Sequence, residues 1–173
     1  MGANLISEKK KIDQILTLVA EVINSRESHW EPGKDWVYYA GPYYDSQEYM
    51  QGVKTLLDGW LVLGAKGTAF ENKFSKLFEK PFGVLTNSGS SANLLMMLAM
   101  TSKNLYNFPK GTKVITPIAG FPTTINPIIQ LGFQPIFVDV EVDTLNLNLD
   151  HLEQACIENP DAKILTFAHV LGN

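Results

Sequence analysis

A run of small polar residues near the middle of the chain holds the side chains best suited to chemistry. Residues 82–85 form an apolar run typical of a buried strand, residues 87–91 are Asn, Ser, Gly, Ser and Ser, and an apolar helix pattern follows from Leu94. A strand, a small-residue turn and a helix N-terminus present backbone N–H groups and hydroxyls to an anion such as phosphate. The pattern therefore predicts a phosphate site, with a capped helix after a buried strand as the alternative.

Three residues of this turn are the candidates for holding the anion. Gly89 can adopt a positive φ or allow the close approach of a ligand. Ser90 and Ser91 can cap the helix, or their hydroxyls can donate hydrogen bonds to phosphate oxygens. Because serine is also an ordinary helix-capping residue, the turn alone does not separate the two interpretations.

The elements around this turn follow from hydrophobic periodicity. From residue 82 onward predicted strands alternate with predicted helices. The strands span residues 82–86, 113–116, 135–138 and 163–167, and the helices span residues 91–101, 123–131 and 150–157. The alternation predicts an α/β fold, in which a mostly parallel sheet is flanked by helices joined in right-handed crossovers.

The carboxyl ends of the predicted strands carry most of the unusual residues. Ligands of parallel sheets bind at these ends. The 87–91 turn, residues 117–121, Asp139 and residues 169–173 all follow a predicted strand. We expect Asp139 to cap or orient the turn after its strand. The convergence favours a ligand site over a simple helix cap.

The N-terminal part has a different pattern. Apolar residues recur at helical spacing between Ile12 and Ile23, which predicts an amphipathic helix starting near Ser7. We expect this helix to pack on the outside of the domain or on a partner subunit. Residues 26–44 predict irregular chain, in which His29 is a surface or hydrogen-bonded residue.

Two further helices are expected before the alternation begins. One spans residues 46–60, and the other follows Gly64 and ends before Pro81. The second is expected to face inward with Phe70, Phe74, Leu77 and Phe78. We therefore divide the chain into N-terminal helices with an irregular segment, residues 1–60, and an α/β domain, residues 61–173.

Composition excludes several classes of partner. The chain has 173 residues, a formal net charge of −4 and no basic block, so neither nucleic acid nor a membrane surface is an expected partner. No apolar run is long enough to span a bilayer, and we expect no signal peptide. Cys156 is the only cysteine, which excludes an internal disulfide and fits a cytoplasmic location. On its predicted helix it is expected to be a small core residue, and no metal site is predicted.

Several segments at the strand ends resemble one enzyme family. Residues 86–94, TNSGSSANL, are similar to the phosphate-binding turn of the fold-type I pyridoxal-phosphate enzymes of the DegT-like sugar aminotransferase family. Residues 118–127, IAGFPTTINP, resemble the family segment whose aromatic residue stacks on the cofactor ring, and residues 137–148 resemble the next strand and turn. The resemblance runs from residue 57 to the last residue. It implies the N-terminal part of a fold-type I aminotransferase-like large domain, so that residues 61–173 are an incomplete cofactor-binding domain.

One branch of the family is most similar. The forms SGSSANLL, GFPTTxNP and HVLGN, the last at residues 169–173, resemble the CDP-6-deoxy-hexulose 3-dehydrases. This branch implies removal of the 3-hydroxyl from a CDP-4-keto-6-deoxyhexose, in making 3,6-dideoxyhexoses for the lipopolysaccharide O-antigen. It also implies pyridoxamine or pyridoxal 5′-phosphate as cofactor, a [2Fe–2S] cluster in the full-length enzyme, a homodimer and a reductase partner.

The resemblance assigns roles to individual residues. Gly89, Ser90 and Ser91 would hold the cofactor phosphate, and Phe121 would stack on the pyridine ring; without the resemblance Phe121 would be a core residue. Two residues keep alternatives. Asn126 is a support for the Phe121 turn or a solvent-facing helix residue. His169 contacts substrate or cofactor, or is a buried structural histidine.

One departure from the family concerns length. Family members are more than twice as long, and three of their features lie beyond the position of Asn173. These are the acid that pairs with the pyridine nitrogen, the catalytic Lys or His, and the cluster cysteines. The resemblance therefore implies an N-terminal fragment that is inactive alone. A nucleotide-sugar aminotransferase of the same family and a non-catalytic remnant are the alternatives, and the exact sugar is not specified by the sequence.

Overall fold

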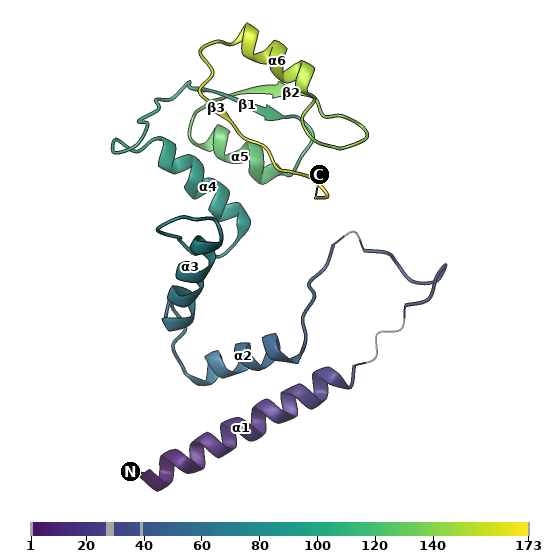
Figure 1. Ribbon diagram of the computed structural model, residues 1–173, viewed down its shortest axis with the longest axis vertical. Helices are drawn as coiled ribbons and strands as arrows, with labels where there is room; N and C mark the ends of the chain where they lie inside the picture. The colour runs from purple at the N-terminus through teal and green to yellow at the C-terminus, as the bar shows by residue number, and fades with distance from the viewer. Residues whose placement is uncertain (1, 27–29, 39, 173) are drawn as a thin grey trace. The chain divides into compact units, whose positions relative to one another are not determined.

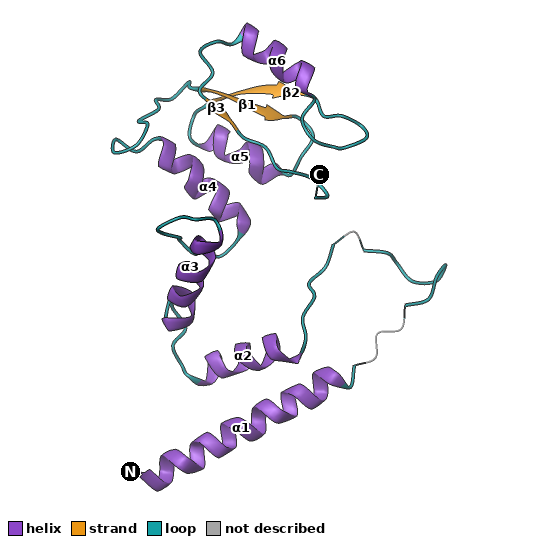
Figure 2. Cartoon of the chain, viewed as in Figure 1, coloured by secondary structure: helices purple, strands orange, loops and turns teal. Residues whose placement is uncertain are grey.

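The computed structural model describes residues 2–26, 30–38 and 40–172. The chain divides into two compact units, residues 1–83 and residues 84–173; Figure 1 traces them from purple to yellow and Figure 2 distinguishes their helices and strands. The sequence-based division at residue 60 stays a prediction. His29, expected at the surface, lies outside the described residues.

The first unit consists of helices that local signals define. α1 (Gly2–Asn24) contacts α2 (Ser46–Leu57), and α3 (Ala65–Leu77) follows them in the chain. The predicted start of α1 near Ser7 is wrong, because the turn before it also contains good helix formers, alanine and leucine. No helix within the described ranges is both long and apolar enough to cross a membrane.

The ends of α2 have clear physical causes. The Gln47 N–H donates to Asp45 Oδ1 at 2.6 Å, and the Asp45 N–H donates to Glu48 Oε2 at 2.8 Å, which completes a capping box. The helix stops at Leu57 instead of the predicted residue 60, because Gly59 adopts a φ of 70° that ends helical geometry.

The prediction that α3 faces inward with its large apolar residues is wrong for this structure. Phe70, Phe74, Leu77 and Phe78 are all exposed. The Phe70 and Phe74 rings stack along the helix, with 5.2 Å between their centroids. The buried residue of α3 is Ser75, where Gly83 passes so close that an added Cβ would lie 3.3 Å from the Ser75 Cβ.

The second unit is built on a parallel sheet of three strands in the order β2-β1-β3. β1 (Lys113–Pro117) is central, with β2 (Gln134–Val138) and β3 (Ile164–Leu165) on either side. α4 (Gly89–Met100) precedes β1, α5 (Pro122–Gln130) connects β1 to β2, and α6 (Leu149–Glu158) connects β2 to β3. The predicted α/β fold with a parallel sheet and flanking helices is confirmed.

Each face of the sheet has its own core. Side chains alternate along β1. Val114 therefore packs with Met97 of α4 and with Ile128 of α5, whereas Ile115 packs on the opposite face with Ala155 of α6. The two cores fix α4 and α5 on one side of the sheet and α6 on the other (Figure 1).

Three sequence predictions about residues 82–173 are wrong. Residues 82–86 form no strand, and Phe82 and Val84 are exposed, because a strand needs a hydrogen-bonding neighbour that apolar content cannot supply. β3 covers only Ile164–Leu165, shorter than the predicted 163–167. Cys156 is exposed, because Ala155 is the residue that α6 turns toward the sheet.

Candidate functional site

The N-terminus of α4 is capped by a serine that sequence reasoning did not single out. Ser88 is the N-cap: its Oγ accepts from the Ser91 N–H at 3.1 Å and donates to Ser91 Oγ at 3.1 Å. Of the two roles open to Ser90 and Ser91, capping the helix therefore belongs to Ser88 instead. The signal was present in the sequence, since serine preceding the first helical residue is a preferred N-cap.

This capping arrangement leaves donors for an anion. The first N–H groups of a helix have no partner within the helix, and here they belong to Gly89 and Ser90. Ser90 is exposed, and an added Cβ at Gly89 would meet no heavy atom within 4 Å, so the space in front of this turn is open. Because the Ser91 hydroxyl accepts its bond from Ser88, its own proton is available to an outside acceptor.

An asparagine that sequence reasoning also missed joins this turn to the next helix. The Asn93 Nδ2 group donates to the Thr123 carbonyl oxygen at 3.4 Å, across thirty positions of sequence. Thr123 lies in the first turn of α5, at the carboxyl end of β1. The contact brings the α4 N-terminus to the ligand-binding edge of the sheet. A polar residue inside the apolar run of α4 was the available signal.

Phe121 lies at this same edge. It is the N-cap residue of α5, with Pro122 at the first helical position, where a proline fixes the start of a helix. Its side chain is 67% exposed, so it is not the core residue that the sequence without the family resemblance predicts. An exposed aromatic side chain at the start of α5 is suited to stacking against a planar ring.

The other predicted residues have simpler surroundings. Asn126 is exposed on α5. Asp139 Oδ1 accepts from the Val140 N–H at 2.8 Å, so Asp139 orients the turn after β2 as expected. His169 is exposed rather than buried, with its ring edge-on to Phe167 at a centroid distance of 5.0 Å.

One charged pair of this unit lies at the other end of the central strand. Lys113, at the start of β1, donates to Asp161 Oδ1 at 2.9 Å, and this hydrogen bond lowers the pKa of the Asp161 carboxyl. The pair stands at the amino end of the central strand, opposite the candidate site. We assign it a structural role.

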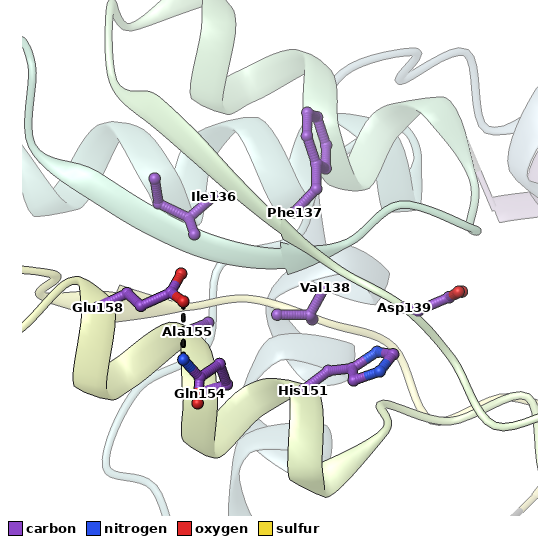
Figure 3. A pocket seen from close by; sticks show the side chains of 8 residues that line it. All are labelled: Ile136, Phe137, Val138, Asp139, His151, Gln154, Ala155 and Glu158. Atoms are coloured by element: carbon purple, nitrogen blue, oxygen red, sulfur yellow. Dashed lines mark hydrogen bonds between the residues drawn. The ribbon is translucent and has the colours of Figure 1, made fainter.

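A groove of about 240 Å³ lies between β2 and α6 (Figure 3). Figure 3 shows Phe137 directed away from α6, and it shows the hydrogen bond of 2.7 Å from Gln154 Nε2 to Glu158 Oε1. His151 and Asp139 stand at its rim.

No three His, Cys, Asp or Glu side chains gather as a metal site in the part of the chain that the structure describes. The groove therefore offers no ligand set for an iron–sulfur cluster.

Comparison with known proteins gives this geometry a context. The chain is 41% identical over 165 residues to the lipopolysaccharide biosynthesis protein RfbH of Salmonella typhimurium, covering 93% of this chain and 37% of that protein. It is 37% identical over 164 residues to the dTDP-4-dehydro-2,6-dideoxy-D-glucose 3-dehydratase of Saccharopolyspora spinosa, covering 93% of this chain and 35% of that protein.

A solved structure shows the same fold. The GDP-4-keto-6-deoxy-D-mannose-3-dehydratase of E. coli with bound hydrated PLP superposes with a TM-score of 0.65 at 32% identity, covering 73% of this chain and 32% of that chain. The fold is thus that of the fold-type I pyridoxal-phosphate enzymes, and the chain spans about a third of the length of such relatives. The sequence pattern of one family matches residues 43–173. The chain belongs to the DegT/DnrJ/EryC1/StrS aminotransferase family.

Proposed function

We propose that this chain is the N-terminal portion of a pyridoxamine-phosphate-dependent 3-dehydrase acting on a CDP-4-keto-6-deoxyhexose. The observation that carries the proposal is the open first turn of α4, which contains the Gly89 and Ser90 N–H groups and the Ser91 hydroxyl. These donors suit a phosphate dianion, because hydrogen bonds to a charged acceptor are stronger than neutral ones and the helix dipole favours negative charge.

The residues present fit the cofactor at both of its ends. The α4 turn would hold the phosphate, and Asn93 keeps this turn in place relative to the start of α5. The exposed face of Phe121 would stack on the pyridine ring and fix its plane. The cofactor, when bound, supplies an amine for the sugar ketone and a ring that accepts electrons. This chain's contribution is to bind and orient that group.

The choice of substrate rests on the sequence forms. The motifs SGSSANLL, GFPTTxNP and HVLGN and the similarity to a lipopolysaccharide biosynthesis protein support a sugar for the O-antigen. Other relatives are named for GDP-linked and dTDP-linked sugars, so the CDP nucleotide rests on the sequence forms alone. A homodimer, a reductase partner and a cytoplasmic location complete it. Asn126 as support for the Phe121 turn is also part of the proposal.

A nucleotide-sugar aminotransferase is the alternative, because the family as a whole is described as one of aminotransferases. Both reactions use the same phosphate turn and the same stacking residue, so the described site serves either. A non-catalytic remnant that keeps only the phosphate turn is the other alternative. We expect the chain alone to bind the cofactor without turning over substrate, and multiple turnovers of a CDP-4-keto-6-deoxyhexose by the purified chain would contradict this.

A titration tests the binding proposal. Pyridoxamine 5′-phosphate is added to the purified chain and to its Ser91→Ala variant, and binding is followed by absorbance. Loss of one charge-assisted hydrogen bond should cost about 1.5–3 kcal/mol of affinity. Ser25→Ala is the matched control, since Ser25 Oγ also makes an exposed side-chain hydrogen bond, to Val22 O at 2.9 Å, in the other unit. Equal affinities for the wild type and Ser91→Ala would contradict the assignment.

A further inference from the structure

The loops that follow β2 and β3 are joined by a side chain. The Val170 N–H donates to Asn146 Oδ1 at 3.2 Å, and Asn146 is half-buried. β2 and β3 are not neighbours in the sheet, because β1 lies between them. The bond therefore spans the carboxyl edge of the sheet from one side to the other. It ends at Val170, in the same loop as His169.

The turn that carries Asn146 is firmly braced. The Glu141 N–H donates to the Asn146 carbonyl oxygen at 2.9 Å, and the Asn146 N–H donates to Thr144 Oγ1 at 3.2 Å. The next residue, Leu147, is 6% exposed and belongs to the core between the sheet and α6. Because the backbone on both sides of Asn146 is fixed, its amide oxygen is a fixed acceptor for the opposite loop.

The loop after β3 needs such an acceptor. Its last hydrogen bond to the sheet is from the Thr166 N–H to Ile115 O at 3.0 Å, and beyond it His169 is exposed. Leu171 has a φ of 55°, a conformation that costs free energy for a residue with a bulky side chain. Such strain persists where surrounding contacts hold it, and it concentrates at ligand-binding loops.

We propose that Asn146 is a positioning residue that holds His169 at the cofactor-binding edge. β3 is the direct neighbour of β1, and the turn after β1 carries Phe121, so a ring stacked on Phe121 would lie toward the loop of His169. Asn146 fixes the backbone at Val170, and the His169 imidazole then offers a ring nitrogen to a polar oxygen of the cofactor. The inference rests on the proposed cofactor function.

The test compares variants of the whole chain by titration with pyridoxamine 5′-phosphate. Asn146→Leu removes the acceptor, and Asn146→Asp keeps an oxygen in its place. We expect Asn146→Leu and His169→Ala each to weaken binding about fivefold, as for one lost hydrogen bond, and the double variant to be no weaker than either. Asn146→Asp should bind as the wild type does. Asn159→Leu is the control, because Asn159 Nδ2 makes a comparable bond to Ala155 O at the end of α6.

Hydrogen exchange at the Val170 amide, measured without cofactor, separates this inference from the proposed function. We expect protection in the wild type and in Asn146→Asp, and its loss in Asn146→Leu. Full affinity in Asn146→Leu, when Ser91→Ala binds weakly, would overturn the positioning role and leave the proposed function standing. An unprotected Val170 amide in the wild type would overturn the positioning geometry alone. Absence of binding by the wild type would overturn both proposals.

Discussion

The two units of the chain bury their apolar residues very differently. In residues 84–173 both faces of the sheet are covered, and residues such as Val114 and Ile128 are fully buried. Among the described residues of 1–83 no apolar side chain is buried, and Ser75 is the buried residue. The first unit is therefore held by local signals such as the capping box of α2, whereas the second is held by long-range packing through its crossovers.

The largest expected effect comes from the core of the second unit. Ile128→Ala should lower the free energy of unfolding of residues 84–173 by about 2–5 kcal/mol, because it leaves a cavity among Met97, Val114 and Phe133. Leu18→Ala on α1, where the residue is 59% exposed, should change the free energy of unfolding of residues 1–83 by less than about 0.5 kcal/mol. Urea unfolding measures both. Equal losses for the two variants would show that the contrast between the units is mistaken.

Removing a buried hydroxyl gives the next largest effect, an increase in the free energy of unfolding. Thr116 is fully buried on β1, and its Oγ1 has no hydrogen-bond partner within the described chain. Thr116→Val replaces the hydroxyl by a methyl group of similar shape and should raise the free energy of unfolding by about 1–3 kcal/mol. Thr116→Ser, which keeps the hydroxyl and loses a methyl group, is the matched comparison. A destabilised Thr116→Val would reveal a partner for the hydroxyl.

The capping box of the first unit sets a smaller effect. Asp45→Ala removes the acceptor for the first turn of α2 and should cost about 1 kcal/mol of helix stability. The loss of helicity in far-UV circular dichroism of the whole chain, compared with that of Asp58→Ala at the other end of α2, measures it. If both variants lost the same helicity, the box would not be what starts the helix.

The smallest effect concerns pH. The hydrogen bond from Lys113 lowers the pKa of Asp161 below its ordinary value of 3.8, so the carboxylate form is favoured by folding. A depressed pKa contributes stability above the unfolded-state value, and that contribution is lost as the pH falls through the folded-state value. We expect Lys113→Met to flatten the pH dependence of stability below about pH 4, the range in which unfolded Asp titrates. Because the pair is exposed to solvent, the change will be small.

Much of the second unit could be predicted from sequence because its signals are local. The helical and strand periods located α4, α5, α6, β1 and β2 within a few residues. The strand expected at 82–86 failed because pairing depends on a neighbour elsewhere in the chain. The prediction that Cys156 is a core residue failed, because its burial depends on which side of α6 meets the sheet.

The candidate site could be predicted only in outline. Residue types indicated the α4 turn, whereas only the family resemblance indicated Phe121. The contacts of Ser88 and Asn93 needed the structure, because they depend on how a hydroxyl or an amide is directed at a distant backbone atom. The link from Asn146 to Val170 likewise joins positions that no period relates.

The central claim is that the N-terminus of α4 binds the cofactor phosphate. Amide chemical shifts measured by ¹⁵N NMR during addition of pyridoxamine 5′-phosphate test it most directly. We predict that the amides of Gly89 and Ser90 shift with saturation, because they point at the bound phosphate. The first amides of α6, Leu149 and Asp150, serve as the internal control. Like α4, this helix has a side-chain N-cap, which is Asn148, but it lies on the opposite face of the sheet. Equal shifts at the two helix starts, or none at Gly89 and Ser90, would contradict the account.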